Sequence, residues 1–151
     1  MKVIQSIYMV VALLIFTTFN TSTIRNLKVD DVNSIQVVTG PHLRDELGIE
    51  AIKQVVNWLH LSKETKLTGK FDKRPAMLKI KLNDGRLLIV TKAVRWIHTN
   101  NPDGSGFSRS IPIQDEILIN FDSKRIQVKS PDLFNFLTEI TYVNSPNGGR
   151  H

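Results

Sequence analysis

The sequence contains no cysteine among its 151 residues. This absence excludes disulfides, thiolate metal sites, a cysteine nucleophile and a lipid-modified cysteine behind a leader segment. An exported domain of this length does not need disulfides, because one hydrophobic core can hold it together. The remaining composition, with 41% apolar and 23% charged residues, is ordinary for a globular chain and predicts one domain behind a leader.

The motifs of common enzymes and cofactor sites are also missing. The four histidines form no HxxxH or HExxH pair, so the spacing of a zinc site is absent. No serine lies in a GxSxG elbow, and there is no GxxxxGK(S/T) loop. Asp115 and Glu116 are neighbours, so on a strand they would point to opposite faces and could not form a catalytic pair. We therefore predict no catalytic, cofactor-binding or metal-binding residue, which favours a non-enzymatic function.

The stretch NPDGSG at 101–106 resembles the first half of a calcium-binding loop. Position 12 of such a loop should be a glutamate that supplies two oxygens, but here it is Pro112, and Asp103 is the only carboxylate left. A surface turn explains the stretch better. The glycines and Arg109 that follow could present backbone N–H groups and a cation to an anion.

Residues 3–19 form an oily segment behind Lys2, and three interpretations of it stay open. A cleaved signal peptide fits the basic start and short apolar core, although no alanine between Leu13 and Ala51 marks a cleavage site. An uncleaved membrane anchor needs about 20 apolar residues, which places this segment at the lower edge. Packing within the domain core is the third, and the lack of a polar face argues against it. We assign 1–25 to a signal peptide or membrane anchor, 26–143 to one domain and 144–151 to a disordered tail.

Two helices are predicted from apolar residues at helical spacing. The first lies at 48–61, with an inner face formed by Ile49, Ile52, Val56 and Leu59. The second follows Ser130, because serine is favoured at the N-cap and the next residue is a proline, which is favoured at the first helical position.

About five strands are predicted around these helices. Residues 34–40 form the first, 77–82 and 87–98 form a hairpin about Asp84 and Gly85, and 116–129 form a second hairpin about a turn at 122–125. The lysine-rich stretch 65–75 is a connection or an edge strand, and the stretch 41–47 is a turn. The order β-α-β-β-β-β-α predicts an α+β fold, in which helices pack on one face of an antiparallel sheet.

The net charge of +6 is concentrated in the middle third of the chain. Residues 53–95 carry eleven Lys or Arg and three Asp or Glu, and each flanking segment has a net charge of −1. Such a patch could bind an anionic partner, or it could be a solvated face that keeps the protein soluble. The candidate contacts for an anion or another partner are Lys70, Lys73, Arg74, Lys79, Lys81 and Arg109.

The leader together with IQVVTG, IEAIKQVVNWLH and LKIKLNDGRLLIV resembles small exported α+β domain proteins of unknown function from Gram-positive, Bacillus-type bacteria. The resemblance covers about residues 24–142 and lies in the pattern of elements, so no functional residue is carried over. It implies a strand and a helix before a sheet of hairpins that ends in a short helix. Several such proteins are lipoproteins, and this cysteine-free chain departs from them.

These observations favour a non-enzymatic binding or regulatory domain outside the cytoplasm, either secreted or anchored by its N-terminal segment. We expect no cofactor, and we expect the partner to be an anionic wall polymer, a lipid headgroup or a protein. Nucleic acid is not expected for an exported protein. If the leader is not cleaved, residues 3–19 would contact the membrane. Two alternatives stay open: a protein-interaction module (an inhibitor, immunity or exclusion factor) and a small hydrolase whose site has no recognisable motif.

Overall fold

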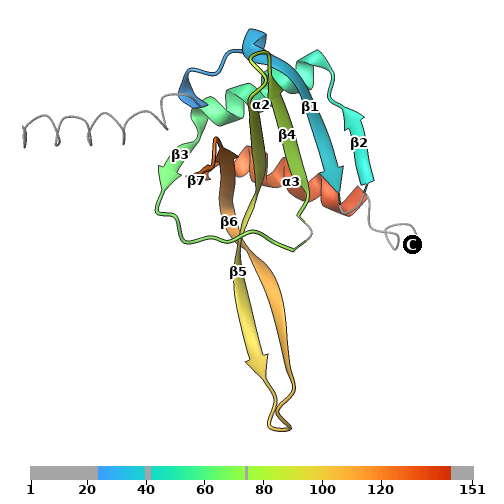
Figure 1. Cartoon of the computed structure of the whole chain (residues 1–151), viewed down its shortest axis with the longest axis vertical. Coiled ribbons are helices and arrows are strands. Elements are labelled where there is room, and N and C mark those ends of the chain that lie inside the picture. Colours follow the sequence, from blue (N-terminus) through green and yellow to red (C-terminus); the bar gives the residue numbers. More distant parts are fainter. Residues whose placement is uncertain (1–23, 40–41, 74, 144–151) are drawn as a thin grey trace, which may run out of the picture.

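Seven antiparallel strands and two helices are formed by the residues that the computed structural model describes, which are 24–39, 42–73 and 75–143 (Figure 1). The strand order in the sheet is β2-β1-β4-β5-β6-β7-β3. In chain order the elements are the short 3-10 helix η1 (Val29–Asp31), β1 (Val32–Thr39), β2 (His42–Glu46), α2 (Ile49–Leu61), β3 (Lys63–Thr65), β4 (Met77–Leu82), β5 (Leu87–Asn100), β6 (Gly106–Phe121), β7 (Lys124–Lys129) and α3 (Pro131–Val143).

The predicted α+β class, antiparallel sheet and two helices are confirmed, and the strand number is larger than predicted. The predicted turn at 41–47 is wrong, because β2 pairs with β1 there and forms one edge of the sheet. At the other edge β3 pairs with β7. Both strands escaped prediction because a three-residue strand has no measurable periodicity and HLRDE has no β-branched residue.

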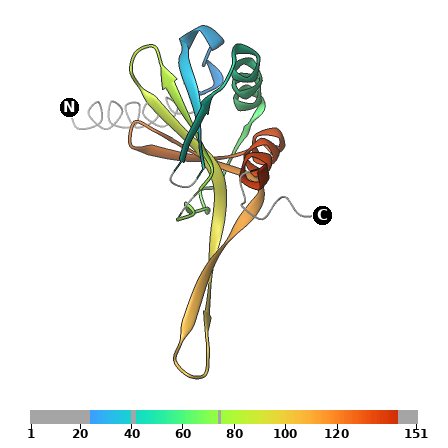
Figure 2. The same cartoon turned by 90° about the vertical axis from the view of Figure 1, so that its right-hand side faces the viewer.

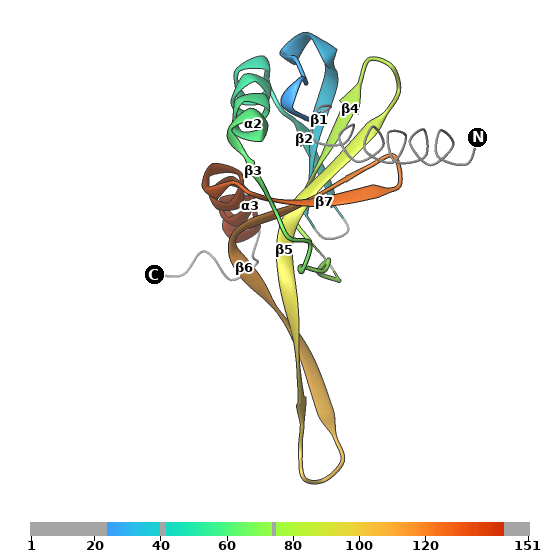
Figure 3. The ribbon, with the colours of Figure 1, turned by 90° about the vertical axis from the view of Figure 1, so that its left-hand side faces the viewer.

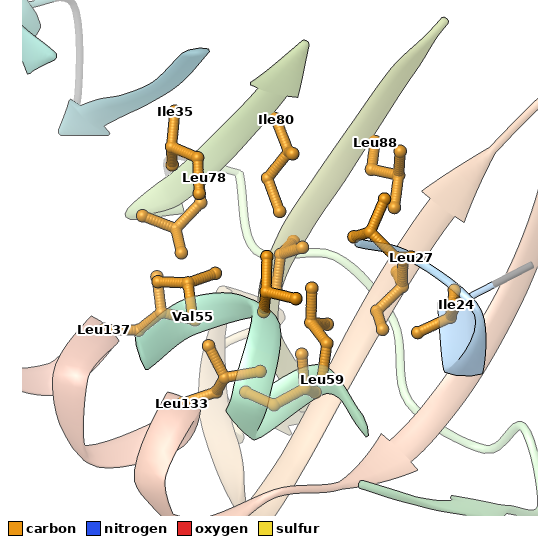
Figure 4. Close-up of a cluster of buried hydrophobic side chains, with 14 of the residues drawn as sticks. Ile24, Leu27, Ile35, Val55, Leu59, Leu78, Ile80, Leu88, Leu133 and Leu137 are labelled. Carbon is orange, nitrogen blue, oxygen red and sulfur yellow. The ribbon is translucent and has the colours of Figure 1, made fainter. Parts of the chain in front are cut away.

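Both helices pack on one face of the sheet and close the main core with it (Figures 2 and 4). From α2, Val55 and Leu59 are fully buried, and from α3, Leu133 and Leu137 are fully buried. The predicted inner position Ile49 is wrong: it is the first residue of α2 and is 58% exposed. The sheet contributes alternate residues to this core, among them Ile35, Leu78, Ile80, Leu88, Val90, Ile117 and Ile119. Full burial of each such side chain contributes about 1.5–3 kcal/mol to folding.

The two predicted hairpins are present. Gly85 has a φ of +86° in the β4–β5 turn, where Asp84 accepts hydrogen bonds from the backbone N–H and side chain of Arg86. Asp122 and Ser123 adopt positive φ between β6 and β7, and both are residue types that tolerate this conformation only at tight turns. Turn chemistry that is visible in the sequence therefore sets both registers.

The first described residues, which precede η1, pack into the core of the domain. Ile24 and Leu27 are each 4% exposed and lie in the core beside Leu59 (Figure 4). His60, at the end of α2, donates a hydrogen bond from Nε2 to the carbonyl of Leu27 at 2.5 Å and holds this segment to the helix. The predictions for the leader at residues 3–19 and the tail at 144–151 lie outside the described residues. Among the helices that are described, none is long and apolar enough to cross a membrane.

Candidate functional site

The candidate site lies on the face of the sheet that turns away from α2 and α3, which we call the outer face. Alternation along β4 directs Leu78, Ile80 and Leu82 to the core and Lys79 and Lys81 to the outer face. Neighbouring residues of one strand face are about 7 Å apart, so the two lysines present their charges side by side.

Cross-strand pairing places one residue from each of five neighbouring strands in a row on the outer face. Gln36 of β1 lies opposite Lys79, which lies opposite Ile89 of β5. Ile89 in turn lies opposite Asn120 of β6, and Asn120 lies opposite Arg125 of β7. Arg125 is therefore a further cation of the outer face, and the sequence analysis missed it because only strand pairing brings it to the row of Lys79.

The connection from β3 to β4 crosses the outer face, and we call it the crossing segment (residues 66–76, of which 74 is not described). Of the two roles predicted for 65–75, a connection or an edge strand, the structure shows a connection, with Thr65 as the last residue of β3. The Gln127 side chain, which is 2% exposed, accepts hydrogen bonds from the backbone N–H groups of Thr68 at 2.9 Å and Gly69 at 2.7 Å. Gln127 also donates to Glu116 at 3.1 Å, and Glu116 accepts a second bond from Thr65 at 2.6 Å. These bonds hold the start of the crossing segment against β7.

The middle of the crossing segment is held by backbone pairing with β5. Lys70 and Val94 exchange two backbone hydrogen bonds of 2.8 and 3.0 Å. Gly69 must be a glycine for lack of space, since a Cβ there would lie 2.7 Å from the Cβ of Ala93. Further on, the hydroxyl of Thr91 donates to the carbonyl of Ala76 at 3.1 Å. The segment is therefore a fixed part of the outer face.

Two aromatic rings, Phe71 of the crossing segment and Trp96 of β5, each make a cation–π contact. The Lys73 ammonium lies 5.3 Å from the ring centre of Trp96, and the Arg125 guanidinium lies 4.3 Å from that of Phe71. The indole N–H of Trp96 donates to the carbonyl of Phe71 at 3.1 Å, which joins the two pairs. Such cation–π contacts are worth about 0.5–1 kcal/mol at exposed sites, enough to restrict the side chains but not to neutralise their charge.

The predicted contact residues divide among the outer face, which carries Lys79 and Lys81, the crossing segment, which carries Lys70 and Lys73, and β6, which carries Arg109. Lys70, Lys73 and Lys81 are exposed and Lys79 is half-buried. Arg74 lies outside the described residues. In the described part of the chain, ion pairs join Lys53 to Glu50 and Arg86 to Asp84, and none neutralises these four lysines. We call Lys70, Lys73, Lys79, Lys81 and Arg125 the basic face.

Arg109 lies on β6 opposite Ile97, in the part of the β5–β6 hairpin that projects from the sheet and was not predicted (Figures 1 and 3). The strands β5 and β6 have 14 and 16 residues, while their neighbours β4 and β7 have 6 each. Residues 94–100 therefore pair with 106–112 beyond the sheet, and we call this ribbon the arm. The predicted strands end at residue 98 and resume at residue 116, so the outer part of this hairpin was missed.

A large bulge separates the arm from the sheet. Lys92 pairs with Ile117 and Val94 pairs with Pro112, so four β6 residues face a single β5 residue. Asp115 within the bulge has a φ of 60°, and its carbonyl accepts the backbone N–H of Ser130 at 2.8 Å, just before α3 begins. Bulges bend and twist the strand that carries them, so this one sets the direction of the arm relative to the sheet.

The tip of the arm is a turn whose polar groups bond to one another, as predicted for a surface loop. Asp103 accepts bonds from the backbone N–H and the hydroxyl of Ser105 at 2.9 and 2.6 Å, and these bonds lower the pKa of its carboxyl below the ordinary value. Gly104 has a φ of +81°. Within the described residues no cluster of three or more metal-ligating side chains forms.

Two small cavities lie elsewhere in the domain. One of about 300 Å³ lies beside the β4–β5 turn; of its charged lining residues, Asp84 and Arg86 are paired with each other and Asp31 accepts the backbone N–H of Lys28. The other, of about 70 Å³, is lined by Lys92, Asp72 and Thr91 among others. Burial lowers the pKa of Lys92, and the nearby Asp72 carboxylate opposes this shift. A cavity of that size holds a water or two but not a substrate of ordinary size.

Comparison with known proteins finds no family model, no curated protein and no solved structure that matches this chain. The resemblance to small exported domains therefore stays a prediction, and function must be argued from the two surfaces just described. The basic face offers fixed cations on an open, rigid sheet. The arm offers a narrow ribbon with exposed apolar side chains and free strand edges.

Proposed function

We propose that the protein is a non-enzymatic binding module that presents its basic face to an anionic partner. The observation that supports this most directly is that five cations, from β4, β7 and the crossing segment, are not neutralised by any ion pair within the described residues. The surrounding sheet and crossing segment hold their backbones in place, so little backbone conformational entropy is lost on binding.

The chemistry of the face favours a repeating anion. Four of the five cations are lysines, which act as hydrated point charges and suit phosphate or carboxylate groups without demanding a fixed geometry. The face is an open sheet surface, which suits an extended polymer or a layer of headgroups. An anionic wall polymer and an anionic lipid headgroup share this chemistry, and both fit an extracytoplasmic protein that is secreted or anchored by its leader.

Charge reversal on the basic face tests the proposal. In Lys79→Glu/Lys81→Glu, affinity for polyphosphate-rich wall polymer or for anionic vesicles should fall by at least about thirtyfold, since each lysine near such a surface contributes about 1 kcal/mol. Wild-type affinity should also fall steeply as salt is added. Binding is measured by co-sedimentation with each material separately, which distinguishes polymer from lipid.

A matched control is available on the other side of the domain. Lys28→Glu/Lys53→Glu lowers the formal net charge by the same amount, from +6 to +2, at exposed positions remote from the basic face. It should reduce affinity only a few-fold through the general field of the protein. Equal losses in the two double variants, or binding that does not depend on salt, would show that the basic face is not the contact surface.

A second candidate function, a protein-interaction module such as an inhibitor, immunity or exclusion factor, is favoured by the arm. Its apolar side chains are exposed, with Phe107 at 54% and Ile97 at 40%. A two-stranded ribbon that leaves apolar groups in water is marginal by itself, which is typical of an element that completes its packing on a partner. Photo-crosslinking from position 107 in the producing cell tests this: a protein adduct supports it, and purely lipid adducts contradict it.

A further inference from the structure

The two faces of the arm differ in chemistry. Cross-strand pairs place Arg95 opposite Ile111, Ile97 opposite Arg109, and Thr99 opposite Phe107 on one face. Apolar and guanidinium groups therefore alternate on this surface, which we call the arm face. Asp103 at the tip has an oxygen that is already engaged by Ser105, and Asp115 in the bulge accepts from the side-chain amide of Gln114.

The opposite face of the arm is polar and internally bonded. His98 and Ser108 lie opposite each other and their side chains form a hydrogen bond of 2.6 Å. Trp96, at the base, is committed to the crossing segment through Phe71 and Lys73. The side of the arm whose apolar and guanidinium groups are available to a partner is thus the arm face.

The outer edge of β5 adds backbone groups to this capacity. Val94 directs its N–H and C=O outward to Lys70, so the residues two, four and six further along, Trp96, His98 and Asn100, direct theirs outward as well. Within the described residues no strand pairs with this edge beyond Val94. The Lys70 bridge shows that the edge accepts an antiparallel backbone at its base.

We propose that the arm binds an extended acidic segment of a partner protein, which pairs along the outer edge of β5 and sets carboxylates against Arg95 and Arg109. This inference rests on the second candidate function and names the chemical class of the partner. The cations of the arm face are arginines, which bind carboxylates through two parallel hydrogen bonds. Ile97 and Phe107 supply apolar contacts for alternate side chains of the added strand.

Two other occupants fit less well. A second copy of the chain would bring like charges together, because the net charge is +6 and both arm cations have the same sign. A lipid surface would leave the N–H and C=O groups of the β5 edge without partners in an apolar layer, which is costly. A protein strand satisfies the edge and the arginines together.

The test uses the full chain and a fluorescently labelled synthetic peptide of roughly eight residues, the length of an ordinary strand, in which glutamate and valine alternate along one face and threonine fills the positions between. Anisotropy should show saturable binding, and the same peptide with lysine in place of glutamate should not bind. A glutamate–valine peptide that is N-methylated at alternate residues should bind at least about tenfold more weakly, because it cannot complete the edge hydrogen bonds. Equal binding of the methylated peptide would overturn strand addition.

Charge variants separate the arm from the basic face. Arg95→Glu/Arg109→Glu should weaken binding of the acidic peptide by more than about tenfold, while Lys79→Glu/Lys81→Glu, with the same change in net charge, should alter it less than about threefold. The conservative Arg95→Lys/Arg109→Lys should keep part of the affinity. Both arginines are exposed, so the variants should unfold at the wild-type temperature, which a thermal melt checks.

Several other results would overturn the proposal that the arm binds an acidic segment. Equal losses in the two reversals, arm adducts only with lipid, or a dimer that needs Phe107 would overturn the acidic-segment proposal. A crosslinked protein whose contact segment is basic or neutral would overturn it too, while leaving the second candidate function standing. The polymer and vesicle assays test the basic face independently of all these results.

Discussion

Replacing Gln127 by leucine should destabilise the protein by about 3 kcal/mol, because one amide holds the crossing segment to the sheet. The side chains are similar in volume, so Gln127→Leu removes hydrogen bonds without opening a cavity. The bonds to Thr68, Gly69 and Glu116 are lost, and each is worth about 0.5–1.5 kcal/mol net. Gly69 is buried, so its N–H is left without a partner, whereas the exposed Thr68 can turn to water.

Urea unfolding measures this change, and Trp96 reports where it acts. In a Trp58→Phe background, loss of the amide should loosen the crossing segment and alter Trp96 emission before the main transition, since Trp96 bonds to Phe71 of that segment. Gln36→Leu is the matched control: Gln36 is half-buried on the same face, and the change should cost less than about 0.5 kcal/mol. If Gln127→Leu costs no more than Gln36→Leu, then the amide does not hold the segment and the reasoning is refuted.

Three further predictions concern packing, charge and the arm. Gly69→Ala should cost about 1–3 kcal/mol through its contact with Ala93, and adding Ala93→Gly should recover part of that loss in a double-mutant cycle by urea unfolding; strictly additive effects would contradict the contact. Lys92→Met should stabilise the fold slightly near neutral pH, because burial disfavours the charged ammonium. The folded-state pKa of Lys92 is lowered below its ordinary 10.5, so the destabilisation of the wild type by the buried charge decreases as pH rises from that lowered value to 10.5. The stability difference between the variant and the wild type should therefore shrink in alkaline melts. A difference that stays constant would contradict the pKa shift. Gly104→Ala should strain the arm tip, where φ is +81°, by about 1 kcal/mol, and amide exchange should quicken in residues 97–109 while α2 is unchanged; quickening throughout the domain would show that the arm is not an independent unit.

Local patterns in the sequence were enough to predict most of the main sheet. The β4–β5 hairpin could be read from the alternation of Leu78 and Ile80 with Lys79 and from the Asp84-Gly85 turn, because each signal acts between residues that are close in the chain. The two helices could be read in the same way from their apolar spacing. Ile49 was misassigned because spacing alone does not say where a helix first meets the core.

The parts that were missed depend on contacts between distant residues. The edge strand β3 has three residues and exists because β7 offers it a free edge. The fixed position of the crossing segment depends on Gln127, which lies 58 and 59 positions away from Gly69 and Thr68. No local pattern in TGKFDK predicts that the buried side-chain amide of Gln127 will hold this segment in place.

The candidate site shows the same division. The sequence by itself determined that the middle third is basic and that Lys79 and Lys81 share one face, because charge content and strand alternation are properties of neighbouring residues. Only the tertiary structure decided that Arg125 belongs with them and Arg109 does not. Pairing between strands brings residues 79 and 125 into one row, whereas the bulge at 113–116 directs Arg109 along an arm away from the sheet. These are long-range arrangements that depend on which backbone groups meet, and the order of residues along the chain does not contain that information in any readable local form.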